Sequence, residues 1–526
     1  MRYATYSGVE WTYPDTIFTD YDKLKAQVDL PRGGHDGIQL LGEMVTDGLP
    51  VTAQLIWKGG VGPSAEFFEM VCVGVNENTD SEFMTTSDYS RCSKFVTRCA
   101  PFCVYDALRP LEKVMHGSRL ALYIRFFAGE MPAGRFEGTL HIQVGEEHLE
   151  VLVECRIYMA EIPRLQDSKL GMLNFFCYEN LTDQHGAVQN SQEYWNWYRR
   201  YVRAQLDMRC THILLPGGEP IYDENKNICG FDFSQAEQAA KIAFEEGAPF
   251  ICGAHIAHWH TWNETEYFLG WADTVSTLST EGYLQMKLYF EAWAKVLYRN
   301  DWWKQTTQAL ADEPQTHNDI AYRAMAAVFR KYLPSIPIVD AVETVNLGGG
   351  VDVWVPKQDT YEKNKNAFDC LKNVGENIWF YTCAFPAGQI MNRSMDLPLT
   401  VSRLVLWMGF GYDLSGFLHW GFNYYIGSDI WNSACCPHKG KLLPAGDAHV
   451  VYPGQNSVWP SMRFEAQRGG AEDYELLMQL AKYDYEKAQE LTARVCTSFR
   501  SYTSDSNIFC KVRRELLEQL DKVYCL

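Results

Sequence analysis

Hydrophobic and polar residues alternate strictly near residue 150. Apolar side chains occupy every second position from 140 to 144, Gly145 follows, and the alternation resumes from 149 to 157. A period of two on both sides of a short polar turn is typical of a β-hairpin. Residues 51–57 show a similar pattern, and no long helical pattern comes before residue 160. We therefore predict an antiparallel β-sandwich over residues 1–163.

Beyond residue 163 the pattern changes to short apolar segments that alternate with helical ones. We expect eight strands, within "GMLNFFCY", "THILL", "PFICGAHIA", "QALA", "IPIVDAV", "VDVWVP", "NIWFYTC" and "GFLHWGF". Such alternation requires a parallel sheet, and eight units of this length suit a closed (β/α)8 barrel. We predict an α/β barrel of this type over residues 164–470. A C-terminal extension of helices, residues 471–526, is expected to pack on the barrel.

Composition excludes several classes of partner. The 526 residues are 47% hydrophobic, and 66 acidic against 47 basic residues give a net charge of −19. This surface repels phosphate backbones, so we expect no nucleic-acid partner. No apolar stretch approaches the ~20 residues of a membrane span, and the N-terminus has no secretion signal pattern. We expect a cytoplasmic protein that does not bind membranes; the pattern does not indicate an oligomeric state.

Cysteine usage indicates neither a disulfide scaffold nor a metal centre. The 16 cysteines are dispersed, as in proteins of a reducing compartment. The densest group is "SACCPHK", with Cys435, Cys436 and His438. Adjacent cysteines splay apart and no matching pair follows, so we expect no metal site and no cofactor.

Two adjacent carboxylates, Asp312 and Glu313, follow the fourth predicted strand and precede Pro314. In a (β/α)8 barrel the active site lies at the carboxyl ends of the strands. Neighbouring residues of a strand face opposite sides, so both acids reach one ligand only if the strand stops here. Pro314 is compatible with such a stop. The same motif also fits a helix N-terminus, so by itself it does not distinguish the end of a strand from the start of a helix.

Aromatic and polar residues follow several other predicted strands. The third strand is followed by three histidines, of which His258 is our candidate for substrate contact, and the sixth, seventh and eighth bring Trp354, Tyr381, Trp420 and Asn423. Rings beside amide and imidazole groups are typical of sugar-binding surfaces. Each of these aromatic residues alone is more often a core residue than a ligand contact, and the histidines match no standard metal motif. Their recurrence at the same end of several strands favours a carbohydrate substrate.

Glycoside hydrolysis normally uses two separated carboxyl groups. Residues 377–395, the seventh strand and its loop, contain no Asp or Glu, and the substitutes Glu343 and Asp429 are not well placed in this arrangement. Adjacent acids instead suit substrate-assisted hydrolysis of a 2-acetamido sugar: one protonates the leaving oxygen while its neighbour holds the acetamide N–H. The repulsion between them raises one pKa. A glycosidase with a second carboxylate and a non-catalytic sugar-binding barrel remain alternatives.

Four segments carry a resemblance to a known family: "ADEP", "VDVWVP", "NRSMDLPLTVSRLVLWMGFGYDLSGFLHWGFNYY" and "GDAHVVYPGQNSVWPSMRFEAQRGGAEDYELL". Over residues 160–480 the chain resembles glycoside hydrolase family 123. The resemblance implies a (β/α)8 β-N-acetylgalactosaminidase, exo-acting, that retains configuration through an oxazoline-like intermediate without a cofactor. It also implies Glu313 as general acid/base and Asp312 as the group that orients the acetamide. The pattern around Asn392, Arg393, Trp420 and Asn423 is similar too, which makes these residues candidates for substrate binding.

Overall fold

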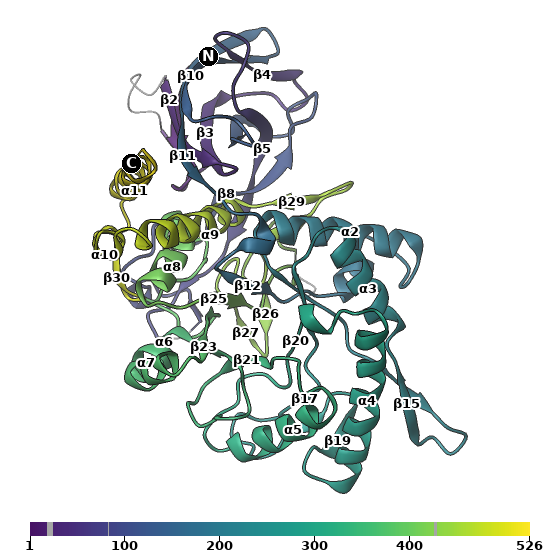
Figure 1. The fold of residues 1–526 in the computed structure, drawn as a ribbon. Helices are drawn as coiled ribbons and strands as arrows, with labels where there is room; N and C mark the ends of the chain where they lie inside the picture. The colour runs from purple at the N-terminus through teal and green to yellow at the C-terminus, as the bar shows by residue number, and fades with distance from the viewer. Residues whose placement is uncertain (18–24, 83, 426–428, 526) are drawn as a thin grey trace. The chain divides into compact units, whose positions relative to one another are not determined.

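The structure is a computed structural model that describes residues 1–17, 25–82, 84–425 and 429–525. The chain forms two compact units (Figure 1). The sandwich unit consists of Met1–Asp167, Ala384–Asp413 and Asn423–Leu526, and the parallel-sheet unit consists of Ser168–Cys383 and Leu414–Phe422. The first segment of the sandwich unit ends at Asp167, close to the boundary that we predicted at residue 163. The segments after residue 383, except 414–422, group with the N-terminal strands, which differs from the predicted division.

Two sheets of the sandwich unit share one hydrophobic core. The five-stranded sheet has the order β1 (Tyr3–Ser7), β3 (His35–Met44), β9 (Arg119–Phe127), β5 (Ser64–Val75), β8 (Phe102–Pro110). The four-stranded sheet has the order β2 (Lys25–Arg32), β11 (Glu147–Glu161), β10 (Gly134–Val144), β4 (Val51–Trp57). All pairs are antiparallel except β2 with β11. The predicted hairpin is β10–β11, where Val144 pairs with Glu147 and Gly145 turns with φ +58°.

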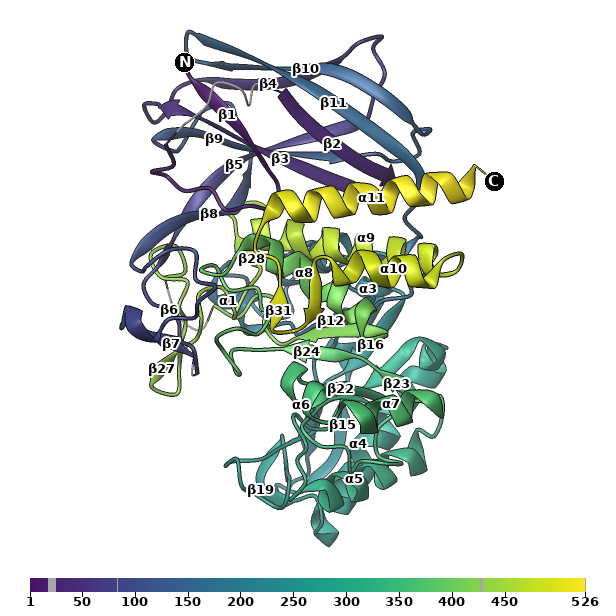
Figure 2. The same cartoon turned by 90° about the vertical axis from the view of Figure 1, so that its left-hand side faces the viewer.

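The C-terminal helices belong to the same unit. α8 and α9 pack on each other, and both are buried along most of their length. α11 contacts β11 and α9, as Figure 2 shows for the yellow helix, whereas we had expected it to pack on the barrel. Arg156 of β11 donates to Glu518 (3.3 Å) and Asp521 (2.9 Å). The apolar stripe of α11 predicted a buried face, but periodicity contains no information about which surface covers it. These helices span α8 (Leu399–Gly411), α9 (Met462–Ala481), α10 (Tyr485–Ala493) and α11 (Ser506–Tyr524).

Short elements complete the sandwich unit. They are β6 (Asn78–Thr79), β7 (Thr85–Thr86), the 3₁₀ turns η1 (Tyr89–Arg91) and η2 (Leu165–Asp167), β26 (Pro437–His438), β27 (Lys441–Leu442), β28 (Val451–Pro453), β29 (Val458–Pro460), β30 (Cys496–Ser498) and β31 (Ser501–Tyr502). Each strand in this group pairs with its neighbour in the chain.

The parallel-sheet unit is a mixed α/β fold in which each of the eight predicted strand segments contains or overlaps a strand. One parallel sheet has the order β20 (Thr306–Gln308), β16 (Phe250–Gly253), β13 (His212–Leu214), β12 (Gly171–Asn174), β25 (Gly416–His419), β24 (Phe380–Thr382). A second has the order β21 (Val339–Val342), β22 (Val353–Pro356), β23 (Asn377–Ile378). Parallel bridges also join Gln308 to Ile338 and Lys357 to Tyr381. The strands are shorter than predicted, and β20 shares only Gln308 with the predicted fourth strand.

Helices lie between these strands in the chain. They are α1 (Glu179–Asp183), α2 (Gln192–Asp207), α3 (Ser234–Glu245), α4 (Thr280–Arg299), the 3₁₀ turn η3 (Trp303–Gln305), α5 (Asp319–Tyr332), α6 (Gln358–Lys363) and α7 (Lys365–Asn373). Ser191 and Ser279 cap α2 and α4 by accepting from backbone N–H groups. Further strands are β14 (Glu219–Tyr222), β15 (Ile228–Asp232), β17 (Ala257–His258), β18 (Phe268–Leu269) and β19 (Ala272–Ser276). None of the helices in the described ranges combines the length and apolarity that a membrane-spanning segment requires.

Candidate active site

The acid pair lies where the chain leaves β20. Ala311 still forms a parallel bridge with Ala257, and the backbone then bends at Asp312 and Glu313. Glu313 has φ +47°, in the left-handed region. For a residue with a Cβ atom this conformation costs roughly 1–2 kcal/mol. It ends the alternation of the strand, so that consecutive side chains need not face opposite sides. Backbone strain of this kind is concentrated at functional sites, where the surrounding structure holds it.

A single buried carboxylate fixes the backbone that leads to the pair. Asp340 of β21 accepts through Oδ2 from the N–H groups of Leu310 (2.8 Å) and Ala311 (3.3 Å). Tyr322 of α5 donates to the same oxygen, and Asp340 Oδ1 lies 3.1 Å from His255 Nε2. Asp340 therefore connects two strands and a helix directly before the acid pair. Its charge lies within an otherwise apolar predicted strand, which was the signal in the sequence for a specific partner.

Tyr381 connects Glu313 to a third acid. Its hydroxyl donates to Glu313 Oε1 and lies 3.2 Å from Glu343 Oε1. Glu343 also accepts from Lys357 Nζ and from the hydroxyl of Thr360. Tyr381 thus lies beside the acids, as we expected. Glu343 and Lys357 lie there too. From the sequence, Glu343 was not expected to be well placed for the site, and Lys357 was not a candidate.

The surroundings of the pair favour protonated carboxyl groups. Displacement of water by the surrounding protein, followed by repulsion from Asp312, raises the pKa of Glu313 to about 8, although the Tyr381 hydrogen bond opposes the shift. The pKa of Asp312 is also raised, again first by desolvation, while His255 and Lys357 favour its ionised form. Asp312 is exposed and Glu313 half-buried, so a ligand can reach both. With a pKa of about 8 for Glu313, the pair therefore holds a proton near neutral pH.

Both cations of this cluster are held charged by its acids. Burial alone would lower the pKa of Lys357, which is 5% exposed, but Glu343 raises it. Burial likewise opposes the charge of His255, and the hydrogen bond to Asp340 raises the pKa of this imidazole. The cations thus pair first with Glu343 and Asp340. The negative charges of Asp312 and Glu313 are therefore compensated less strongly by Lys357 and His255.

Two residues expected in the wall of the site have other contacts. Trp354 is 1% exposed, donates from Nε1 to Glu376 Oε2 (3.0 Å) and packs edge-on against Phe368 of α7. Its neighbours Val353 and Val355 belong to the strand core, so Trp354 lies on the helix-facing side of β22 and is not supported as a sugar platform. His258 faces Asp273, at 2.7 Å from Nε2 to Oδ1.

Trp259, one residue after His258, reaches the acid segment. Its Nε1 donates to the carbonyl oxygen of Asp312 at 3.1 Å, and Trp262 packs edge-on against its ring at 5.3 Å. Trp420 is half-buried after β25, stacked on His419 with 6.4 Å between ring centroids. Trp259 and Trp420 are both half-buried and therefore have surface available to a ligand. The sequence placed Trp259 in the correct loop but did not distinguish it from its neighbours.

The remaining candidates belong to the sandwich unit. Asn392 donates to Asp447 Oδ1 (3.3 Å), and the buried Arg393 donates to Gln467 Oε1 (3.2 Å) and to the Asp447 carbonyl (3.3 Å). Asn423 is buried and forms a backbone bridge with His449. Their role in substrate binding stays a prediction.

Comparison with known families decides the class of the protein. Residues 229–480 match the model of the glycoside hydrolase 123 catalytic domain. This region belongs to glycoside hydrolase family 123. The family 123 region includes every candidate residue named above, from His258 to Asn423, and parts of both units. The chain therefore carries a glycosidase domain, and a carbohydrate is its class of substrate.

A solved structure shares the fold of the chain. A family 123 glycoside hydrolase from Clostridium perfringens, described in a study of glycolipid glycan hydrolysis, superposes with a TM-score of 0.72 over 99% of both chains at 11% identity. At that identity the match shows a shared fold. A β-D-glucuronidase from Dictyoglomus thermophilum (TM-score 0.35, 10% identity, 89% and 97% coverage) is too distant to support any argument. No curated protein matches the chain.

Proposed function

We propose that this protein is a retaining exo-β-N-acetylgalactosaminidase in which the 2-acetamido group of the substrate acts as the nucleophile. The observation that carries the proposal is the pair itself: Glu313, with a pKa of about 8, directly follows Asp312 at a strained end of a strand. A general acid must be protonated at the working pH, and its neighbour must be close enough to bind the adjacent acetamide.

In the first step Glu313 gives its proton to the glycosidic oxygen, and the bond from this oxygen to the anomeric carbon breaks. The acetamide oxygen forms a new bond to that carbon on the opposite face, which yields an oxazoline-like ring. Asp312 accepts a hydrogen bond from the acetamide N–H and stabilises the positive charge that develops there. In the second step Glu313, now ionised, takes a proton from water. The water attacks the anomeric carbon and reopens the ring, so the configuration is retained.

The strand pairings support a closed barrel as the frame of this chemistry. The six-stranded and the three-stranded parallel sheets are joined by the bridges Gln308–Ile338 and Lys357–Tyr381. Taken in order, these pairs connect the eight strand positions into a ring. We propose that the parallel-sheet unit is a (β/α)8 barrel with the acids at the carboxyl end of its fourth strand.

A second carboxylate nucleophile is the competing mechanism, and Glu343 is its best candidate. Glu313 and Glu343 contact the same Tyr381 oxygen, so the two carboxyl groups lie near each other, as the mechanism of retaining glycosidases with two carboxylates requires. However, Tyr381 occupies the space between them, where the sugar would have to lie. Glu343 is also neutralised by Lys357 and bonded to Thr360, which lowers its nucleophilicity. The adjacent pair is therefore favoured.

The substrate follows from this chemistry and from the family. The mechanism requires a 2-acetamido group, and the similarity to family 123 favours galactosamine at the end of a glycan. The Clostridium perfringens relative was studied for glycolipid glycan hydrolysis. We propose the same broad class, a glycan with a terminal β-linked N-acetylgalactosamine, as the substrate here.

A panel of aryl glycosides tests the proposal. We expect hydrolysis of the β-N-acetylgalactosaminide, weaker hydrolysis of the β-N-acetylglucosaminide and none of the plain β-galactoside. A thiazoline analogue of the cyclic intermediate should inhibit strongly. Efficient turnover of the β-galactoside without thiazoline inhibition would assign the reaction to a carboxylate nucleophile. Binding of the sugars without turnover of any would favour a non-catalytic sugar-binding protein.

A further inference from the structure

Two groups of histidine and carboxylate side chains lie outside the acid cluster. Within the described ranges, three or more metal-ligating side chains converge at His141, His148 and Glu150, and at His258, His260 and Asp273. The first group is on the β10–β11 hairpin and the second on the β17–β19 segment. The distances from the histidine nitrogens to the carboxylate oxygen differ between the two groups. They indicate a metal site in the first group and a hydrogen-bonded cluster in the second.

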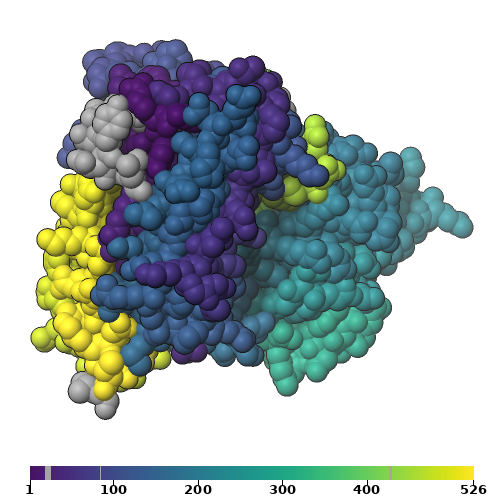
Figure 3. Space-filling model, turned by 90° about the horizontal axis from the view of Figure 1, so that it is seen from above, coloured from purple at the N-terminus to yellow at the C-terminus, as the bar shows by residue number. Residues whose placement is uncertain are grey.

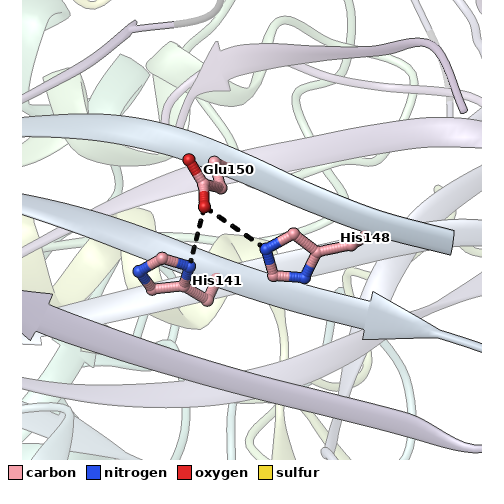
Figure 4. Close-up of side chains that lie close together, drawn as sticks. All are labelled: His141, His148 and Glu150. Atoms are coloured by element: carbon pink, nitrogen blue, oxygen red, sulfur yellow. Dashed lines mark hydrogen bonds and ion pairs between the residues drawn. The ribbon is translucent and has the colours of Figure 1, made fainter.

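The hairpin places its three side chains on one face. His141 of β10 is directly opposite Glu150 of β11, and His148 precedes Glu150 by two positions. Side chains with these offsets point to the same side of a sheet. The intervening residues Ile142 and Leu149 are buried in the core, so the cluster faces outward. Figure 4 shows both imidazole rings turned toward the same oxygen of Glu150.

Two of the three distances in this cluster match those between ligands of a tetrahedral ion, and all three ligand atoms lie within 4.8 Å of one another. His141 Nδ1 and His148 Nε2 each lie 3.4 Å from Glu150 Oε1. With metal–ligand bonds of about 2.0–2.1 Å, two ligands on a tetrahedron are separated by about 3.3–3.4 Å. A good N–H···O hydrogen bond is shorter, about 2.7–3.2 Å. In the second cluster the corresponding distances are 2.7 and 3.0 Å, which fit hydrogen bonds to Asp273.

We propose that His141, His148 and Glu150 bind a divalent first-row transition ion, with Zn²⁺ as the best fit and water as the fourth ligand. Two imidazoles and one carboxylate favour Zn²⁺ over the oxygen-seeking Ca²⁺ and Mg²⁺. β10 pairs with β11 on one side and β4 on the other, so the backbone that carries the ligands is held in the sheet. The blue segment that contains β10 and β11 lies at the surface in Figure 3, and His148 and Glu150 are exposed, so the ion can enter from solvent.

Such an ion would join two strands near the turn at Gly145. It would stabilise the folded hairpin in proportion to the free ion concentration, because the unfolded chain does not hold the three ligands together. Since the imidazoles bind the ion only in their neutral form, we expect binding to weaken on acidification.

A Zn²⁺ titration of the full chain by calorimetry tests this proposal, with the free ion as the probe. We expect His148→Gln and Glu150→Gln each to weaken binding at the high-affinity site at least about tenfold, since even a partner of a ligand contributes 10–100-fold. The matched control is His116→Gln. His116 is a half-exposed histidine of the same unit that faces one carboxylate, Glu112, at 3.1 Å. This control should bind Zn²⁺ as the wild type does, and thermal unfolding without metal should show that all three variants are folded.

Co²⁺ in place of Zn²⁺ identifies the ligands. We expect the visible spectrum of tetrahedral Co²⁺ without a sulfur-to-metal charge-transfer band, and loss of this spectrum in His148→Gln. Six cysteines are exposed and provide the competing ligands: Cys72, Cys99, Cys103, Cys229, Cys370 and Cys525. A sulfur band, or affinities of the two hairpin variants within about twofold of the wild type, would overturn the proposal and leave an adventitious ion only. Glycosidase activity does not enter this test, so the result is independent of the proposed function.

Discussion

The charge of an acid is compensated differently at two places, one in each unit of the molecule. In the sandwich unit, Asp473 accepts from Arg403 (2.7 and 3.0 Å), from Trp407 (3.0 Å) and from Arg513 (2.9 Å). Burial alone would raise the pKa of Asp473, yet the two guanidinium groups lower it. In the parallel-sheet unit, Glu313 adjoins another acid and receives one hydroxyl donor, and its pKa rises to about 8.

The difference separates structural from chemical use of the same functional group. A carboxylate with several charged donors is stabilised as an anion and cannot release or accept a proton near neutral pH. A carboxyl group whose neighbours repel its charge keeps its proton and can donate it. The chain surrounds Asp473 with charged donors, so it is able to compensate a carboxylate. The lack of such donors around Glu313, among the residues that the structure describes, is therefore a feature of the candidate site.

The largest effect that the comparison predicts is on catalysis by Glu313→Gln. Removal of the proton donor should lower kcat/KM on N-acetylgalactosaminides with poor leaving groups by about 10²–10⁴-fold, and much less on activated aryl substrates, which need little proton assistance. Steady-state kinetics on a series of leaving groups measures this. An equal loss on all substrates would assign Glu313 a different role.

Asp312→Asn separates the two acids. It should reduce turnover of poor and activated substrates alike, because the acetamide is held in both cases. It also removes the repulsion that Asp312 exerts on Glu313, so the pKa of Glu313 should fall and the alkaline limb of the pH profile should move to lower pH. A limb that stays in place would show that Asp312 and Glu313 do not interact.

Asp473→Asn tests the structural acid. Two buried guanidinium groups would lose their counter-charge, and breaking such a buried pair costs about 3–5 kcal/mol of unfolding free energy. Denaturation measures this loss, and kcat/KM per folded molecule should stay unchanged. Because the pKa of Asp473 is lowered in the folded state, its contribution is present above the unfolded pKa and is lost as the pH falls through the folded one. The variant should therefore differ from the wild type at pH 7 and less in strong acid.

Glu313→Gln should have the opposite and smaller effect on stability. The folded-state pKa of about 8 lies above the ordinary value of 4.5, so the wild-type group favours folding below pH 4.5 and opposes it as the pH rises through 8. We therefore expect the variant to have a higher thermal midpoint than the wild type at pH 9 and a similar one at pH 4. A lower midpoint at pH 9 would mean that the ionised Glu313 is well compensated.

Local sequence patterns predicted the helices and strands of this protein better than they predicted which of these elements contact one another. Alternation around Gly145 gave the β10–β11 hairpin, and "ADEP" gave the acid pair, because both depend on neighbouring residues. Trp354 was expected in the wall of the site, although the alternation in "VDVWVP" already places it on the face of the strand opposite to Val353 and Val355.

Long-range contacts account for what the sequence did not show. Asp340, Lys357 and Glu343 join the site through contacts between different strands, and α11 is covered by a sheet more than 300 residues earlier in the chain. A charged residue within an apolar strand signals that a partner exists, but not which residue it is.

The pH dependence of kcat/KM on an N-acetylgalactosaminide with a poor leaving group, which needs the proton of the general acid, tests the central claim most directly when wild type and Glu313→Gln are compared. The wild type should lose activity as the pH rises through about 8, the pKa at which Glu313 gives up its proton. In Glu313→Gln this alkaline limb should disappear while the remaining activity persists. An alkaline limb of the same position in the variant would show that another group is the acid.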